Sequence, residues 1–132
     1  MRTYICSILK NNYQLKEAQN GAEALYLIQR ETIDLIVSDL MMPVMDGNEL
    51  SRRVKANLAT SHIPFLMLTA LRSEAQERIS YEIGVDEYLC KPFDEVILRL
   101  RIRNILALRQ KYKSMFSTSM NCETLNINAS SK

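Results

Sequence analysis

The sequence predicts an α/β fold in which a parallel sheet carries helices on both faces. Short apolar runs that suit buried strands alternate with segments whose apolar residues recur at helical spacing. Hydrophobic residues occupy 47% of the 132 positions, which is typical of a globular domain with a single core. No apolar run approaches the roughly 20 residues of a membrane span, so we expect no membrane partner.

Helices and strands are predicted to alternate along the whole domain. The two central strands are nearly continuous apolar runs, as in strands that are buried on both faces of a sheet. Ser73, with Gln76 three residues later, predicts a helix N-cap, and Gly84 suits the left-handed position that ends a helix. The predicted helices are 1–10, 22–30, 47–57, 73–83 and 93 to beyond 108, and the predicted strands are 13–18, 33–37, 64–68 and 86–89.

A carboxylate, a hydroxyl and an ammonium group stand at the carboxyl ends of three predicted strands. Asp39 follows the first of these strands, Thr69 the second and Lys91 the third. Parallel strands end at one edge of a sheet, and ligands bind at that edge, so we expect the three groups to meet. They suit a phosphoryl group on Asp39: the carboxylate attacks, Thr69 donates to one phosphoryl oxygen, and Lys91 balances charge on another.

Longer motifs around these residues resemble those of a known family. They are Asp39 with Met-Met-Pro at 41–43 and Met-Asp-Gly at 45–47, Thr69 with Ala70, and Tyr88 ahead of Lys-Pro-Phe at 91–93. In order and spacing they are similar to the motifs of receiver domains, the response-regulator modules of bacterial two-component systems. The resemblance covers residues 1 to about 113, the expected receiver domain.

The resemblance implies a fold, a phosphodonor and a switch. The fold would be a flavodoxin-like, doubly wound parallel sheet of strand order 2-1-3-4-5. A histidine kinase would supply the phosphoryl group to Asp39, and Thr69 and Tyr88 would then move together and alter the face near the last helix. The Lys91–Pro92 peptide bond is expected to be cis.

The family pattern also includes a strand that this sequence lacks. Receiver domains begin with a strand that ends in two acidic residues, whereas this chain starts inside the following helix, and its first acidic residue is Glu17. We therefore expect an N-terminally truncated receiver with two unpaired ladder edges. Receivers bind Mg²⁺ through the acidic pair, the phosphoacceptor and the carbonyl two residues later. Only Asp39 and the Met41 carbonyl remain, so magnesium binding is expected to be weak or absent.

The last helix and the tail predict self-association. The helix after residue 93 has no broad polar face, and receivers pair through their last helix, so we expect a homodimer to which Ile102, Ile105 and Leu106 contribute. Residues 114–132 are rich in Ser, Thr and Asn, which predicts a polar linker toward an output domain outside this chain. Within them, 124–128 alternates like a strand. This segment is the best donor for the empty sheet position, from the same chain or by strand exchange.

Composition narrows the function classes. A formal charge of +2 is too small to indicate nucleic-acid binding, and we expect none by this chain itself. Cys6, Cys90 and Cys122 are odd in number and lack metal-type spacing, which suits free thiols in the cytoplasm. His62 is the only histidine, so neither a zinc site nor a Ser-His-Asp triad is expected.

Three functions remain open from the sequence. The first is a phosphoacceptor signalling domain, which is no enzyme beyond catalysing its own phosphorylation and dephosphorylation. The second is a phosphatase with an aspartate nucleophile; such enzymes usually place a second Asp two residues later, where this chain has Met41. The third is a phosphorylation-independent interaction module, which is favoured here by the absent acidic pair.

Overall fold

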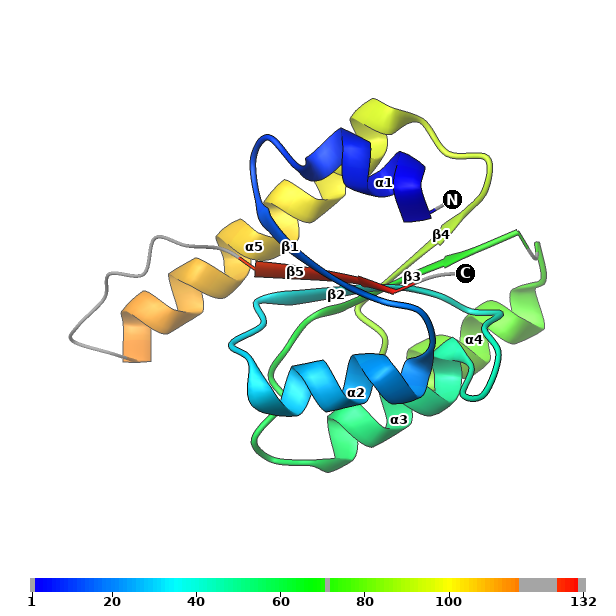
Figure 1. Ribbon diagram of the computed structural model, residues 1–132, viewed down its shortest axis with the longest axis horizontal. Helices are drawn as coiled ribbons and strands as arrows, with labels where there is room; N and C mark the ends of the chain where they lie inside the picture. Colours follow the sequence, from blue (N-terminus) through cyan, green and yellow to red (C-terminus); the bar gives the residue numbers. More distant parts are fainter. Residues whose placement is uncertain (1, 71, 117–125, 131–132) are drawn as a thin grey trace.

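The chain folds as a parallel sheet between two layers of helices, as the alternating pattern predicts. The computed structural model describes residues 2–70, 72–116 and 126–130. Helices α2, α3 and α4 lie on one face of the sheet, and α1 and α5 lie on the other (Figure 1). The helices are α1 (Arg2–Leu9), α2 (Gly21–Arg30), α3 (Gly47–Ala56), α4 (Glu74–Ile83) and α5 (Glu95–Phe116); the strands are β1 (Gln14–Ala18), β2 (Leu35–Asp39), β3 (Phe65–Thr69), β4 (Glu87–Cys90) and β5 (Asn126–Ser130).

The described sheet has five strands in the order β1-β5-β2-β3-β4, and every neighbouring pair is parallel. This is the expected doubly wound arrangement, with β5 in the position where the sequence lacks a strand. The register pairs Lys16 of β1 and Ile36 of β2 with Asn128.

Two expectations about the end of the chain need correction. The last helix continues past residue 113 to Phe116, and residues 126–130 form a strand of the sheet rather than part of a linker. Of the expected 124–128 segment, residues 126–128 belong to this strand, and 124 and 125 lie outside the described residues. Part of the tail is therefore integral to the domain.

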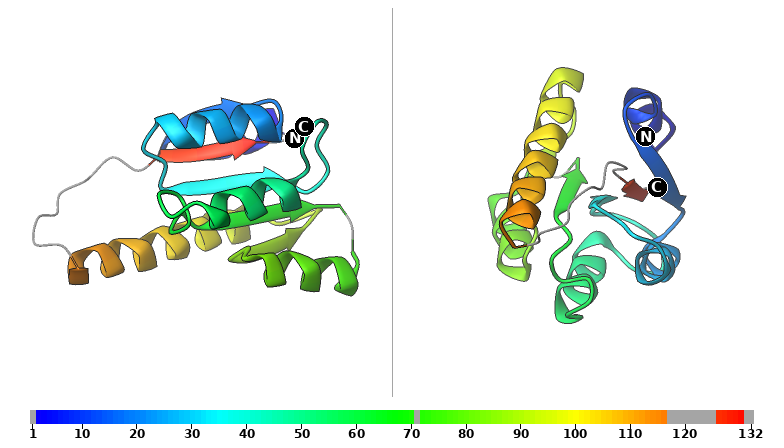
Figure 2. Two further views of the ribbon diagram at one scale, coloured as in Figure 1. Left: turned by 90° about the horizontal axis from the view of Figure 1, so that it is seen from below. Right: turned by 90° about the vertical axis from the view of Figure 1, so that its left-hand side faces the viewer.

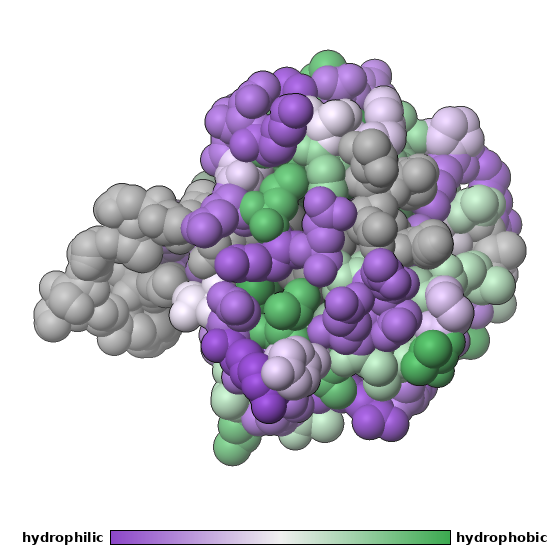
Figure 3. Space-filling model, viewed as in Figure 1, coloured by the Kyte–Doolittle hydropathy of each residue, from purple (hydrophilic) through white to green (hydrophobic). Residues whose placement is uncertain are grey.

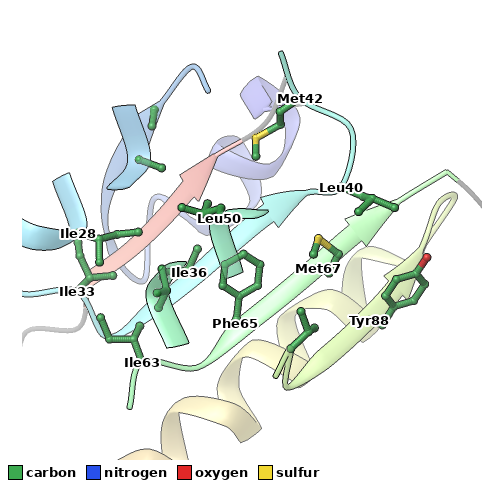
Figure 4. Close-up of a cluster of buried hydrophobic side chains, with 14 residues drawn as sticks. Ile28, Ile33, Ile36, Leu40, Met42, Leu50, Ile63, Phe65, Met67 and Tyr88 are labelled. Carbon is green, nitrogen blue, oxygen red and sulfur yellow. The ribbon is translucent and has the colours of Figure 1, made fainter. Parts of the chain in front are cut away.

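Each face of the sheet has its own apolar cluster. On the α2 and α3 side, the sheet residues Ile36, Phe65 and Met67 pack with Ile28 and Leu50 (Figure 4). On the other side, strand residues that alternate with these pack against α1 and α5; the cluster includes Ile5, Leu9, Leu35, Val37, Leu66, Leu68, Leu98 and Ile102. Because β2 and β3 are buried along their whole length, their ends are fixed in position.

Side-chain caps determine where three helices begin. Asn20, Asp46 and Ser73 each accept a hydrogen bond from the backbone N–H three residues later, at the starts of α2, α3 and α4. The predicted N-cap Ser73 is thus confirmed. Gly84 ends α4 with φ = 125°, a conformation that favours glycine.

Helix α5 buries part of the surface that the sequence assigned to a dimer. Leu98, Ile102 and Leu106 are buried against the sheet, so Ile102 and Leu106 are core residues and cannot form an intermolecular surface. Over residues 95–111 of this helix, whose side chains the structure describes, the exposed large apolar side chains are Val96, Ile97, Leu100 and Leu108. The helix extends beyond the sheet at its C-terminal end (Figures 1 and 2). Among the described residues, no helix combines the length and apolar character that crossing a bilayer requires.

The surface seen in Figure 3 mixes hydrophilic and apolar residues. Over the part of this face that belongs to described residues, the apolar side chains are scattered between charged and polar ones. Single exposed apolar residues are normal on folded proteins and need no partner.

Candidate functional site

Asp39 is the last residue of β2 and lies at the carboxyl edge of the sheet. The strand is apolar up to Val37 and buried throughout, so its backbone has little freedom to move. Asp39 itself is only 7% exposed. A carboxylate in such a place needs a charged or hydrogen-bonding partner, because burial alone disfavours its ionised form.

Lys91 is that partner. Its Nζ lies 2.6 Å from Asp39 Oδ1, in a contact that joins residues 52 positions apart in the chain. Lys91 follows β4, its backbone N–H donates to Thr69 O at 2.7 Å, and the Lys91–Pro92 bond is cis, as expected. The ends of β2, β3 and β4 therefore place the ammonium group against the carboxylate.

Thr69 and Tyr88 occupy the next positions along this edge. Thr69 ends β3 with 1% of its surface exposed, and Tyr88 in β4 is buried as well. The Tyr88 ring lies 6.3 Å from that of Tyr81, centroid to centroid, at a tilt of 45°. Burial raises the pKa of Tyr88, and the neighbouring Thr69 side chain opposes part of this rise. The two residues expected to form a switch are thus neighbours at this edge, and both are buried.

The loop between β2 and α3 closes over the backbone of Asp39. Gly47 donates its N–H to Leu40 O at 2.9 Å, and a Cβ added to Gly47 would lie 2.5 Å from Asp39 O. On the other side of the loop, a Cβ on Gly21 would lie 2.7 Å from Met45 O. Neither close approach was predicted from the sequence, although both glycines stand beside helix starts, where such contacts are common.

The remaining carboxylates of the β2 region are committed elsewhere. Asp46 caps α3 by accepting from the Glu49 N–H at 2.8 Å. Asp34 lies at the opposite end of the strand, where Arg109 contacts it. Only Asp39 among these three carboxylates faces the edge at which Thr69 and Lys91 meet.

Among the described residues, this edge of the sheet offers one carboxylate to a magnesium ion. Mg²⁺ prefers near-octahedral oxygen ligation with one or two carboxylates. Asp39 is the carboxylate at this edge, and its Oδ1 is bound to Lys91. Across the part of the chain that the structure describes, no three His, Cys, Asp or Glu side chains gather around a common point.

Other residues singled out from the sequence lie away from this edge. Cys6 and Cys90 are not in a disulfide within the described residues, and Cys122 falls outside them. His62 is exposed and lines a groove with Ile33 and Arg109, beside the start rather than the end of β3. None of these residues belongs to the Asp39 site.

Comparison with known proteins agrees with this geometry. Residues 1–103 match the response regulator receiver domain family. Histidine kinase P4 of Formosa agariphila is 41% identical over 131 residues; the match covers 99% of this chain and 10% of that protein. The chain thus spans about a tenth of this relative's length.

Solved receiver structures have the same fold. A response regulator from Chloroflexus aurantiacus is 34% identical with a TM-score of 0.76, over 80% of this chain and 87% of that one. The receiver domain of the sensor histidine kinase PA1611 from Pseudomonas aeruginosa is 25% identical with a TM-score of 0.74, over 80% and 88%, and holds magnesium in its active-site cleft. The chain belongs to the response regulator receiver domain family.

Proposed function

We propose that this chain is a phosphoacceptor module in which Asp39 takes a phosphoryl group from a histidine kinase. The contact between Asp39 Oδ1 and Lys91 Nζ, at 2.6 Å, carries the proposal. It joins a nucleophile and a cation at the edge of the sheet where ligands bind in doubly wound folds. Receiver domains act in two-component signalling, and their phosphodonors are histidine kinases.

The transfer follows from the positions of three side chains. An oxygen of the Asp39 carboxylate attacks the phosphorus, the bond from phosphorus to the donor's imidazole nitrogen breaks, and the imidazole leaves with that electron pair. Thr69 donates a hydrogen bond to one phosphoryl oxygen. Lys91 loses part of its contact with the carboxylate and balances the new negative charge.

The phosphoryl group would be read out through Thr69 and Tyr88. Thr69 turns toward the phosphoryl oxygen, and Tyr88, which is already buried, is held in its inward position. Outside this pair lie the exposed apolar side chains of α5, among them Val96, Ile97 and Leu100. We place the dimer surface there instead of at the buried Ile102 and Leu106.

Site mapping after phosphorylation tests the proposal. The chain is incubated with the phosphorylated catalytic region of a histidine kinase, or with acetyl phosphate and Mg²⁺, and the aspartyl phosphate is located by mass spectrometry after borohydride reduction. Labelling at Asp39, and its loss in Asp39→Asn, is the expected result; because the acidic pair is missing, the labelling of this chain should be much weaker than that of a version with the first strand restored. Labelling of Asp34 or Asp46, or undiminished labelling in Asp39→Asn, would contradict it.

A second function, a phosphorylation-independent interaction module, is favoured by one observation. Among the described residues, Asp39 lies against Lys91 and no group of three His, Cys, Asp or Glu side chains could hold a metal ion, which suits metal-assisted phosphoryl transfer poorly. If Asp39 stays unlabelled with every phosphodonor while Asp39→Asn keeps the same partner binding and the same stability, this second function holds. The exposed Met41 gives no support to a phosphatase, because it has no acid/base group.

A further inference from the structure

Strand β5 links two parts of the sheet that have no other pairing in the described structure. It pairs with β1 on one side and with β2 on the other, and β1 has no further neighbour in the strand order. A five-residue segment from the end of the chain therefore satisfies the facing edges of two strands. Whatever supplies this segment completes the sheet.

The sequence of β5 fits this position only in part. Ile127 and Ala129 pair with Leu35 and Val37, which are apolar and buried. Asn128, however, pairs with Ile36, a residue with no exposed surface. Asn and Ser are poor residues for a central strand, so β5 is retained mainly by backbone hydrogen bonds.

Backbone pairing does not depend on which copy of the chain supplies the strand. Helix α5 continues to Phe116, past the sheet (Figure 2), and nine residues, 117–125, connect it to Asn126. A connection of nine residues can span at most about 30 Å. That reach allows the strand to enter its own sheet or the sheet of an adjacent copy in the same register.

We propose that β5 is an exchangeable strand. At micromolar concentration the tail of one copy enters the sheet of a second copy between its β1 and β2, and the second copy reciprocates. Exchange of identical elements preserves every pairing of the closed monomer, so only association entropy opposes it. Because the strand pairs through its backbone on both sides, it finds the same pairings in the sheet of a second copy.

Disulfide trapping between two different variants detects the exchange. Lys16 of β1 pairs with Asn128 of β5, and paired Cα atoms of neighbouring strands are about 5 Å apart, within the range that a disulfide spans. Lys16→Cys and Asn128→Cys are made separately in a background in which Cys6, Cys90 and Cys122 are replaced by alanine. The two proteins are mixed, equilibrated and oxidised, and the products are separated on a non-reducing gel.

A covalent heterodimer that rises with protein concentration is expected from this mixture. The matched control pairs Asn128→Cys with Glu82→Cys, an exposed position on α4, and should give only background cross-linking. The double variant Lys16→Cys/Asn128→Cys reports on both arrangements, because it closes within one chain or between two.

The same variants can overturn the proposal. If the double variant yields only an internally cross-linked monomer and the mixture yields no heterodimer above control, the strand remains in its own sheet. The absence of any cross-link in either experiment also overturns it. No phosphoryl group is needed, so these outcomes are independent of the function proposed for Asp39.

Discussion

At the residue scale, Gly47 determines how closely the loop after β2 can approach the phosphoacceptor. Its N–H bonds to Leu40 O, and the space that a side chain would need is occupied by Asp39 O and by Met67 Sδ, at 2.5 and 2.7 Å from the position of a Cβ. The backbone oxygen that a side chain at Gly47 would displace belongs to Asp39, the proposed phosphoacceptor. A change at Gly47 should therefore affect both stability and the position of Asp39.

Gly47→Ala should lower the free energy of unfolding by about 1–3 kcal/mol, since overpacking against backbone forces the chain to shift. It should also reduce labelling of Asp39. Urea unfolding followed by circular dichroism measures the first effect, and phosphorylation mapping the second. The exposed change Glu82→Ala is the control and should stay within about 0.5 kcal/mol of the natural chain. An unchanged urea midpoint for Gly47→Ala would mean that the loop between β2 and α3 shifts to accept the added methyl group without loss of stability.

The end of β5 lies beside the site and can be used to test the metal argument. Ser130 pairs with Ser38, the residue before Asp39. Ser130→Asp should therefore bring a second carboxylate near Asp39 and raise Mg²⁺ affinity by at least about tenfold, because Mg²⁺ binds through one or two carboxylates. Isothermal titration would measure this change.

Asn126→Asp provides the matched control for that experiment. It adds the same charge at the other end of β5, where Asn126 pairs with Gln14. It should leave magnesium affinity unchanged, and Asp39→Asn should remove any gain that Ser130→Asp produces. Equal magnesium affinities for the Ser130→Asp and Asn126→Asp variants would show that the end of β5 does not lie beside Asp39.

Residue types at strand ends were enough to predict the main site. Asp39, Thr69 and Lys91 could be assigned because each follows an apolar run and because parallel strands end at one edge. The role of Gly47 could not be predicted from sequence, since it depends on a contact across the loop. Nor does sequence order show that Ile102 faces the sheet while Leu100, two residues earlier, is exposed.

At the element scale, α5 is anchored to the far end of β2. Arg109 Nη1 donates to Asp34 O at 2.8 Å, and Arg109 Nη2 lies 3.8 Å from Asp34 Oδ1. Both side chains are largely buried, and this burial lowers the pKa of Arg109. The contact lies one turn beyond Leu106, which is buried, and helps to explain why the helix continues there.

Arg109→Ala should destabilise the domain by about 2 kcal/mol, because it removes a largely buried cation from beside the Asp34 carboxylate and from the Asp34 carbonyl. Chemical unfolding measures the change, and amide hydrogen exchange should show faster opening of the end of α5. Arg52→Ala is the control: it removes an exposed pair with Glu49, which should be worth less than about 1 kcal/mol. If both variants lost the same free energy of unfolding, the contact of Arg109 with Asp34 would contribute no more than an exposed ion pair.

Element types were predictable from the sequence, but several element ends were not. The central strand was expected over 33–37, whereas β2 runs from Leu35 to Asp39. Ile33 is buried and apolar like the strand itself, so hydrophobicity does not show where ladder pairing begins. The end of α5 likewise depends on tertiary contacts such as that of Arg109.

At the scale of the whole molecule, the sheet depends on a segment whose own sequence gives only a weak indication of a strand. Residues 126–130 read NINAS, which is far less apolar than β2 or β3. The alternating pattern indicated a strand, but only the unpaired edges of β1 and β2 explain why it is inserted between them. Demand for backbone pairing here outweighs strand propensity.

Removing β5 should therefore destabilise the entire domain. A chain that ends at Ser119 loses the central strand and exposes the facing edges of β1 and β2, so we expect the free energy of unfolding to fall by several kcal/mol, a large part of the roughly 5–15 kcal/mol of a typical domain. Thermal and urea unfolding by circular dichroism would measure the loss. Asn128→Pro keeps the chain length but removes a backbone donor from the middle of β5, and it should destabilise in the same direction. If both variants unfold at the same temperature and urea concentration as the natural chain, residues 126–130 contribute nothing to the stability of the fold. The strand exchange proposed above would then have no basis either.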